Sequence, residues 1–169
     1  MTEKTVLEGI RVVELSSERC AFAGKLLADM GADVVVVEPP EGSALRRWGP
    51  FVDDVPDPER SLAWWHYNTS KRGVVLDLDD EADRDALRRL VASADLVLEA
   101  EDPGRLAERG LDHADLRRPE LIWISITPFG REGGGRPDLT TDLTVLAAGG
   151  PVWSCGYDDH ALPPVRGLG

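Results

Sequence analysis

Two adjacent cations, Lys71 and Arg72, lie at the start of an apolar segment in a chain that is otherwise strongly acidic. The polar turn from Tyr67 to Ser70 precedes them, and residues 73–78 alternate in the manner of a β-strand. An ammonium and a guanidinium group at one strand entrance are suited to hold a phosphorylated ligand. The alternative is a solvated loop that precedes a core strand.

The overall charge limits the classes of partner. The chain has 31 Asp and Glu against 19 Lys and Arg, a formal net charge of −12 over 169 residues. We therefore expect no nucleic-acid or anionic-membrane partner, because both require a basic face. No apolar run approaches the roughly 20 residues that span a bilayer, and the N-terminus does not begin a signal peptide. Cys20 and Cys155 lack metal-ligand spacing, so we expect no metal site. Two cysteines alone imply no disulfide framework, so we expect a reducing, cytoplasmic location.

The elements that must position these cations follow from the apolar pattern. Helices are predicted at 21–30 and 80–92, with shorter turns of helix from Pro103 and from Asp112. Since strands and helices alternate, the sequence predicts an α/β fold, a Rossmann-like parallel sheet with helices on both faces. We expect one domain over residues 1–150 and the start of a connection to a further segment over 151–169. The predicted strands are 10–15, 33–38, 73–78, 94–99 and 121–126.

Two stretches have neither helical nor strand periodicity. Residues 39–61 are rich in Pro, Gly and Asp, and connections of this length are usually functional or disordered. Residues 129–138 are rich in glycine, which permits close approach of the backbone to a ligand, although a surface loop is an equal alternative. Trp64 and Trp65 predict an aromatic packing cluster.

Eight short stretches, in a fixed order, carry a resemblance to a known family. They include LADMGADVVVVEPP at 27–40 and NTSKRGVVLDL at 68–78. Together they cover nearly the whole chain, which resembles the N-terminal part of a class III CoA-transferase of the formyl-CoA transferase and CaiB–BaiF type. The resemblance implies a Rossmann-like domain that binds coenzyme A. The matching stretches are 7–15, 25–40, 46–50, 67–78, 94–99, 103–104, 118–130 and 163–166.

The resemblance also implies where coenzyme A (CoA) would bind. CoA is a substrate of the family rather than a permanently bound cofactor, and its contacts fall on loops at strand ends, where open parallel sheets bind ligands. Lys71 and Arg72 would lie near the nucleotide. Carried over to this chain, the contacts after the third and fourth strands become Leu76, Asp77, Leu78, Asp79, Ala100, Glu101 and Asp102.

The chain departs from the family at several of these contacts. An acidic side chain at Glu101 has the wrong sign for a polyphosphate. Arg105 and Arg109 lie one helical turn or less from Glu108, where several family members have an arginine. These departures predict weak CoA binding. The differing positions are Pro39, Ala100, Glu101 and Glu108.

The family's chemistry depends on an aspartate that attacks an acyl-CoA and forms covalent carboxyl intermediates. The resemblance places that aspartate a few residues after the match at 163–166, so we expect the 169 residues not to contain it. The implied function is the CoA-binding N-terminal portion of a class III CoA-transferase-like protein acting on acyl-CoA thioesters. It would be an enzyme if a further segment completed it, and the alternative is a diverged, non-catalytic scaffold domain that pairs with an active copy.

A second enzymatic alternative rests on Asp142 and His113. In the racemase branch of the family, an aspartate at the position of Asp142 acts with a histidine to exchange the α-proton of an acyl-CoA. His113 lies close to the position of that histidine but one residue from it, and the racemases have a histidine directly before the aspartate where this chain has Thr141. An α-methylacyl-CoA racemase-like enzyme is therefore kept as an alternative. The other interpretation of Asp142 is a helix N-cap.

The resemblance finally implies a partner chain. Family members form interlocked homodimers, so we expect a homodimer or pairing with a C-terminal segment. The chain alone should then expose apolar surface that is normally covered.

Overall fold

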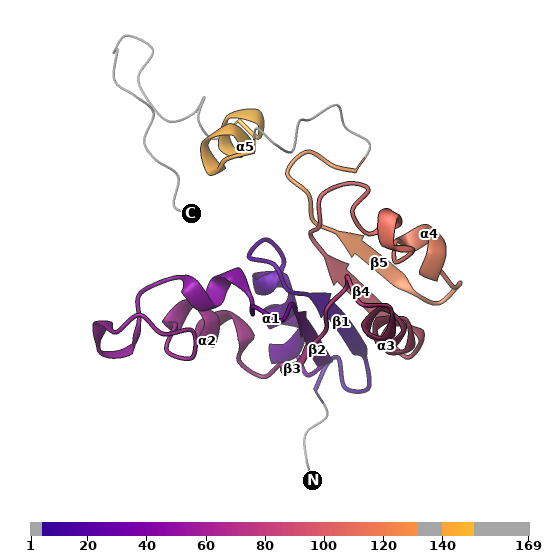
Figure 1. Cartoon of the computed structure of the whole chain (residues 1–169), viewed down its shortest axis with the longest axis horizontal. Helices are drawn as coiled ribbons and strands as arrows, with labels where there is room; N and C mark the ends of the chain where they lie inside the picture. The colour runs from indigo at the N-terminus through magenta and orange to yellow at the C-terminus, as the bar shows by residue number, and fades with distance from the viewer. Residues whose placement is uncertain (1–4, 132–139, 151–169) are drawn as a thin grey trace. The chain divides into compact units, whose positions relative to one another are not determined.

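The structure is a computed structural model that describes residues 5–131 and 140–150 (Figure 1). It divides into two compact units, of which the first ends at Ile126 and the second begins at Thr127. The first is an α/β unit, and the second contains the helix α5 (Asp142–Ala148). The match at 163–166, Cys155 and most of the glycine-rich stretch lie outside the described residues.

The first unit is built on one sheet of five parallel strands in the order β3-β2-β1-β4-β5. This confirms the predicted α/β class. Each strand is close to its predicted range, except that β3 begins earlier and ends at Val75 because its pairing with β2 stops at Glu38. The strand order reverses between β1 and β4, where α/β sheets form a ligand crevice. The strands are β1 (Arg11–Leu15), β2 (Asp33–Glu38), β3 (Arg72–Val75), β4 (Leu96–Glu99) and β5 (Ile122–Ser125).

Helices begin where polar side chains cap them. Asp80 accepts hydrogen bonds from the N–H groups of Ala82 and Asp83 at the start of α3, and Ser61 caps α2 in the same manner. The sequence did not predict α2, which contains both tryptophans of the expected aromatic cluster. The helices of the first unit are α1 (Ala21–Asp29), α2 (Leu62–Asn68), α3 (Glu81–Ala92) and α4 (His113–Leu116), with 3-10 turns η1 (Ala44–Arg47), η2 (Val52–Asp54) and η3 (Ala107–Arg109).

The two faces of the sheet have separate hydrophobic cores, and α1 and α3 lie on opposite faces (Figure 1). Successive valines of β1 alternate between them, with Val13 facing α3 and Val12 facing α1. Leu87 and Val91 of α3 pack on the first face, and Ala28 of α1 packs on the second. Burial on both faces explains why β2 is an unbroken run of valines.

A buried ion pair joins β1 to the turn before β3. The side chains of Glu14 and Lys71 are each 1% exposed. The Lys71 ammonium donates to Glu14 Oε1 at 3.0 Å, to the Ala21 carbonyl at 2.9 Å and to Asn68 Oδ1 at 3.1 Å. These acceptors use its three protons, so Glu14 Oε2 lies 2.8 Å from Nζ without receiving a hydrogen bond. Burial raises the pKa of Glu14 to about 7, although Lys71 opposes the shift.

The same carboxylate sets the spacing between β1 and α1. A Cβ atom on Gly24 would lie 1.7 Å from Glu14 Oε2, so α1 can pack here only through a glycine. Beside it, the buried Cys20 thiol donates to the Leu15 carbonyl at 3.2 Å. Burial raises the pKa of Cys20 to about 12, with Glu14 contributing, and the group therefore stays a thiol. The bond from Cys20 to Leu15 thus fixes the loop that connects β1 to α1.

Replacement of Gly24 by alanine should reverse the usual effect of this substitution. In a helix interior, Gly→Ala normally stabilises by about 0.5–1 kcal/mol. Here we expect Gly24→Ala to destabilise the protein by about 1–3 kcal/mol, because the new methyl group displaces the Glu14 carboxylate. Urea unfolding followed by circular dichroism measures the change.

A double-mutant cycle provides the control. Glu14→Asp withdraws the carboxylate by one methylene, so Gly24→Ala should cost less in the Glu14→Asp background than in the wild type. Equal costs in the two backgrounds would show that the methyl group and the carboxylate do not meet.

The Glu14 carboxyl should titrate near pH 7. Between pH 4.5 and about pH 7, the Glu14 carboxyl is therefore protonated in the folded protein and ionised in the unfolded chain. The contribution of Glu14 to the free energy of unfolding is therefore full below pH 4.5 and is lost as the pH rises through 7. Carbon-13 NMR of the side-chain carboxyls measures the midpoint. Glu81 is the internal control, since Arg84 and Arg88 hold its pKa below the usual value; a Glu14 midpoint as low as that of Glu81 would contradict the assignment.

Candidate functional site

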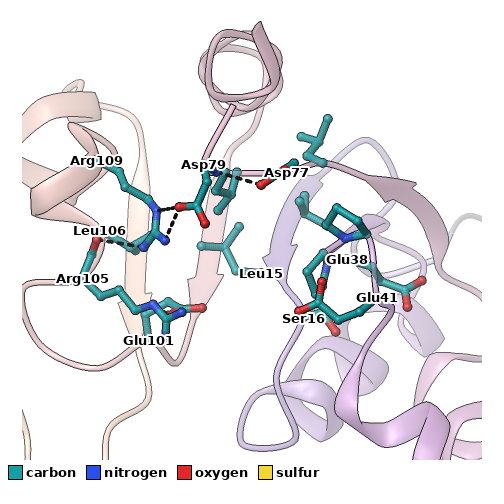
Figure 2. A pocket seen from close by; sticks show the side chains of 15 residues that line it. Leu15, Ser16, Glu38, Glu41, Asp77, Asp79, Glu101, Arg105, Leu106 and Arg109 are labelled. Carbon is teal, nitrogen blue, oxygen red and sulfur yellow. Dashed lines mark hydrogen bonds and ion pairs between the residues drawn. The ribbon is translucent and has the colours of Figure 1, made fainter. Parts of the chain in front are cut away.

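A pocket of about 220 Å³ opens at the carboxyl ends of the strands (Figure 2). Its walls are the segments that follow β1, β2 and β3, together with the segment after β4. It therefore lies at the point where the strand order reverses, the usual ligand position in such sheets. The lining residues are 15–16, 37–41 and 76–79, with Glu101, Arg105, Leu106 and Arg109.

The wall after β2 is fixed by a second carboxylate. Glu38, the last residue of β2, is buried and accepts bonds from Arg46 Nε at 2.6 Å and Nη2 at 2.9 Å, and from the Ser43 N–H at 3.0 Å. Burial favours a higher pKa for Glu38, but Arg46 and the Ser43 N–H outweigh it and lower the pKa. The Arg46 guanidinium also lies 4.0 Å from the ring centre of Trp64. The loop from Pro39 is thus anchored to the sheet and to α2.

The wall after β3 is a short acidic turn that leads into α3. The Asp79 N–H donates to Asp77 Oδ1 at 2.9 Å, and the Asp77 N–H donates to Asp83 Oδ2 at 2.8 Å. Asp80 accepts from the first free N–H groups of α3. Carboxylates of the chain itself therefore bind the amide groups that would otherwise attract an anion at this helix N-terminus.

The wall after β4 carries the cations of the pocket lining. Arg109 donates to Asp79 Oδ1 from Nη2 at 2.5 Å and from Nε at 3.1 Å, as the dashed lines of Figure 2 show. Arg105 Nε lies 3.6 Å from Glu101 Oε2. The pKa of Asp79 is lowered, first by the hydrogen bonds from Arg109 and then by its charge. Both guanidinium groups are therefore paired with carboxylates that also line the pocket.

The structure brings together most of the predicted strand-end contacts. Leu76, Asp77, Leu78 and Asp79 line the pocket, and so does Glu101. Two further predicted contacts, Ala100 and Asp102, do not line it. The Ala100 carbonyl accepts a bond from Arg19 at 3.4 Å, and Asp102 lies 3.7 Å from the same guanidinium.

The predicted cations Lys71 and Arg72 lie elsewhere. The Lys71 ammonium is enclosed in the ion pair with Glu14, and Arg72 donates to both oxygens of Asp33 at 2.8 and 2.6 Å. Asp33 and Arg72 are the first residues of β2 and β3, at the amino ends of the strands, whereas the pocket lies at the carboxyl ends. The structure does not bring these two cations to the pocket.

The pocket also contains residues that the prediction omitted. Ser16 and Glu41 line it, and each directly follows the end of a strand or lies within a few residues of it. The rule that located Leu76 and Glu101 would also have located these two. Leu106, which directly precedes η3, also lines the pocket, and the Leu106 side chain belongs to the hydrophobic core that contains Leu87 and Val91 of α3.

The two candidate proton-exchange residues are described in separate units. His113 is exposed at the start of α4, with its ring centre 5.9 Å from that of Trp123, and does not line the pocket. Asp142 is the exposed first residue of α5. The interpretation of Asp142 as a helix N-cap is wrong, because Thr141 accepts the capping bond from the Thr144 N–H at 3.2 Å. The pairing of these two residues, which lie in separate units, stays a prediction.

Within 5–131 and 140–150, no helix is long and apolar enough to cross a membrane. The same ranges contain no group of three or more side chains that could hold a metal ion.

The sequence matches CoA-transferase family III over residues 7–167. It is 41% identical over 158 residues to succinyl-CoA:(R)-benzylsuccinate CoA-transferase subunit BbsE of Thauera aromatica, a match that covers 92% of this chain and 38% of the relative. It is 46% identical over 136 residues to succinate–glutarate CoA-transferase of Agrobacterium fabrum, covering 77% of this chain and 34% of the relative.

Solved structures give the same result. A crystal structure of a CaiB/BaiF family protein from Brucella suis is similar with a TM-score of 0.85 and 37% identity, covering 98% of this chain and 44% of that one. Rv3272 of Mycobacterium tuberculosis is similar with a TM-score of 0.80 and 31% identity, covering 96% of this chain and 44% of that one. The chain spans less than half the length of these relatives.

Proposed function

The chain belongs to CoA-transferase family III, and we propose that it forms the CoA-binding N-terminal portion of an enzyme that acts on acyl-CoA thioesters. The observation that supports this most strongly is the pocket at the carboxyl ends of β1, β2 and β3. A ligand placed there meets main-chain groups from several strand-end loops at once. For the whole protein we propose transfer of CoA from an acyl-CoA to a carboxylate, in the cytoplasm.

The lining suits a ligand with both apolar and polar parts. Leu15, Leu76, Leu78 and Leu106 supply apolar surface, and the loops that follow the strands supply backbone groups. Backbone contacts require no particular side chain, so they tolerate the departures at Ala100 and at positions beside it. In this proposal CoA is a substrate that enters and leaves.

A second candidate, a diverged domain that binds CoA weakly and acts through a partner copy, is favoured by the charge of the pocket. Its lining contains five carboxylates and two guanidinium groups. One of the carboxylates, Glu38, is neutralised from outside the pocket by Arg46. The remaining acidic excess repels a polyphosphate, and this repulsion lowers affinity without changing the fold.

An apolar surface supports the proposal that the chain pairs with a second copy or with a C-terminal segment. Phe22, Leu26 and Met30 are spaced four residues apart along α1 and its C-cap, and are 55%, 46% and 42% exposed. On the edge strand β5, Ile122 and Ile124 are 57% and 38% exposed. Such contiguous apolar stripes are typical of surfaces covered by another chain or segment.

CoA should bind the 169-residue chain with one-to-one stoichiometry in isothermal titration calorimetry. Ser16→Trp should weaken binding at least about tenfold, because the indole fills the pocket. Ala114→Trp, which adds the same group on α4 outside the pocket, should bind CoA as the wild type does. If millimolar CoA produced no heat, or if Ser16→Trp bound CoA normally, the pocket would not be the CoA site.

The α1 stripe should promote association. Sedimentation velocity should show concentration-dependent association of the wild-type chain, and Leu26→Asp should reduce it by placing a charge in the apolar contact. Val55→Asp is the matched control, since Val55 is 47% exposed and lies outside the stripe. A wild-type chain that stayed monomeric and bound no dye sensitive to apolar surface would contradict the proposal.

A further inference from the structure

We propose that Glu14 and Lys71 form a pH-sensitive positioning pair for the pocket wall that follows β1. With Glu14 ionised, the pair holds the loop 16–20 and the first turn of α1 in place. With Glu14 protonated, Lys71 withdraws and this wall loosens, so ligand binding strengthens as the pH rises through neutrality. The inference concerns regulation of the pocket and rests on the proposed function, because the ligand that detects it is CoA.

The pair is connected to the pocket at both ends of the loop. Glu14 directly precedes Leu15 and Ser16, which both line the pocket. Lys71 Nζ donates to the carbonyl of Ala21, the first residue of α1, at 2.9 Å. Since β1 is paired with β2 on one side and with β4 on the other, a change in the ion pair moves the loop and the helix start rather than the sheet.

The Lys71 ammonium depends on the charge of Glu14 because neither side chain reaches water. Each is 1% exposed, and the other two acceptors of the ammonium, the Ala21 carbonyl and Asn68 Oδ1, are neutral. A proton on Glu14 would leave a buried ammonium without a counterion, which costs far more free energy than an intact pair. Withdrawal of Lys71 toward solvent relieves this cost and breaks the bonds to Ala21 and Asn68.

The turn that carries Lys71 favours this withdrawal. Ser70, the residue before it, has a φ of 67°, in the left-handed region that serine rarely adopts. Such backbone strain persists only while surrounding contacts enforce it. The bonds of the Lys71 ammonium hold this turn against the core, so their loss allows Ser70 to relax. The strain therefore lowers the free energy needed to release Lys71.

Glu14 is the group of this cluster that changes charge near neutral pH. In the described part of the chain, the titratable groups that face it are Lys71, from the turn before β3, and the Cys20 thiol, at the start of α1. The flanking strands place Val36 and Leu98 beside it, and the contact from α2 is a neutral amide. Burial raises the pKa of Glu14 to about 7 and that of Cys20 to about 12, so the thiol stays neutral while the carboxyl titrates. Burial thus favours the proton on Glu14, and loss of the Lys71 contacts is its local cost.

Calorimetric titration with CoA at about pH 6 and about pH 8 tests the proposal. The reference is the double variant Glu14→Gln/Lys71→Met, which removes both charges and keeps only the pH dependence of the CoA phosphates. One unit below a midpoint of about 7, about one molecule in ten has Glu14 ionised. Relative to the double variant, wild-type affinity should therefore be up to about tenfold weaker at pH 6 than at pH 8. A direct charge effect has the opposite sign, because protonation of Glu14 would strengthen the binding of an anion.

Glu81→Gln is the matched control, because it removes a carboxylate of α3 that does not line the pocket. Its CoA affinity should depend on pH as that of the wild type does. A ratio of wild-type to double-variant affinity that stayed constant or fell between pH 6 and pH 8 would overturn the proposal.

Hydrogen exchange of the wild-type chain without ligand provides a measurement that requires no variant. The Cys20 and Ala21 N–H groups donate to the Ser17 carbonyl at 3.3 and 3.1 Å, and they report on the loop. Their protection should fall by up to about tenfold from pH 8 to pH 6, whereas that of the buried Val97 N–H in β4 should not fall. Unchanged protection of the loop would show that the pair does not position it.

The two measurements separate this inference from the proposed function. If CoA binds without the expected difference between pH 6 and pH 8, the pair does not regulate the pocket and the CoA site stands. If CoA binds at neither pH while the protection of the loop changes, the CoA site falls and the positioning pair stands. If CoA does not bind and the protection is constant, both fall. Should the double variant not fold, the exchange of the wild-type chain decides.

Discussion

The buried contact between Glu14 and Lys71 is the interaction on which the arrangement of the other elements depends. It joins the centre of the sheet to the first turn of α1 and to the end of α2, since the ammonium also binds Ala21 and Asn68. Removing two charges from water is costly unless hydrogen bonds replace the lost hydration. Here burial raises the pKa of Glu14 to about 7 although Lys71 opposes the shift, and one carboxylate oxygen receives no hydrogen bond. The absence of a side chain on Gly24 leaves the room that this oxygen needs.

This ion pair also determines which cations remain for a ligand. It holds the Lys71 ammonium in buried contacts outside the pocket lining, and a second carboxylate at a strand end, Glu38, holds Arg46. Cations near the carboxyl ends of β1 and β2 are therefore used to fix loops. Arg105 and Arg109, in the segment after β4, are instead paired with Glu101 and Asp79, whose side chains are 31% and 77% exposed. The two arginines of the pocket lining are therefore paired with carboxylates of the same lining.

The sequence predicted elements whose signal is local. The valines of 33–38 and the capped, amphipathic segment 80–92 have the observed type and nearly the observed ends, and the strand-end rule located Leu76 and Glu101 in the pocket. It could not place Lys71, because burial of the ammonium depends on Glu14, 57 residues away. It also missed α2, a seven-residue helix whose support comes from Ser61 and from the stacking of Arg46 on Trp64. Such support appears only after the chain has folded.

The acidic character of the chain extends into the pocket, where Asp79 and Glu101 pair with Arg109 and Arg105. An unpaired guanidinium group beside the pocket would attract any small anion from the solvent. Because Asp79 and Glu101 neutralise Arg109 and Arg105, a phosphorylated ligand that reached these arginines would exchange one anion for another. The net gain on binding is then the difference between two ion pairs, plus the apolar and backbone contacts of the pocket. In the proposed function, the carboxylates of the lining would therefore lower the affinity for a polyphosphate without changing the fold.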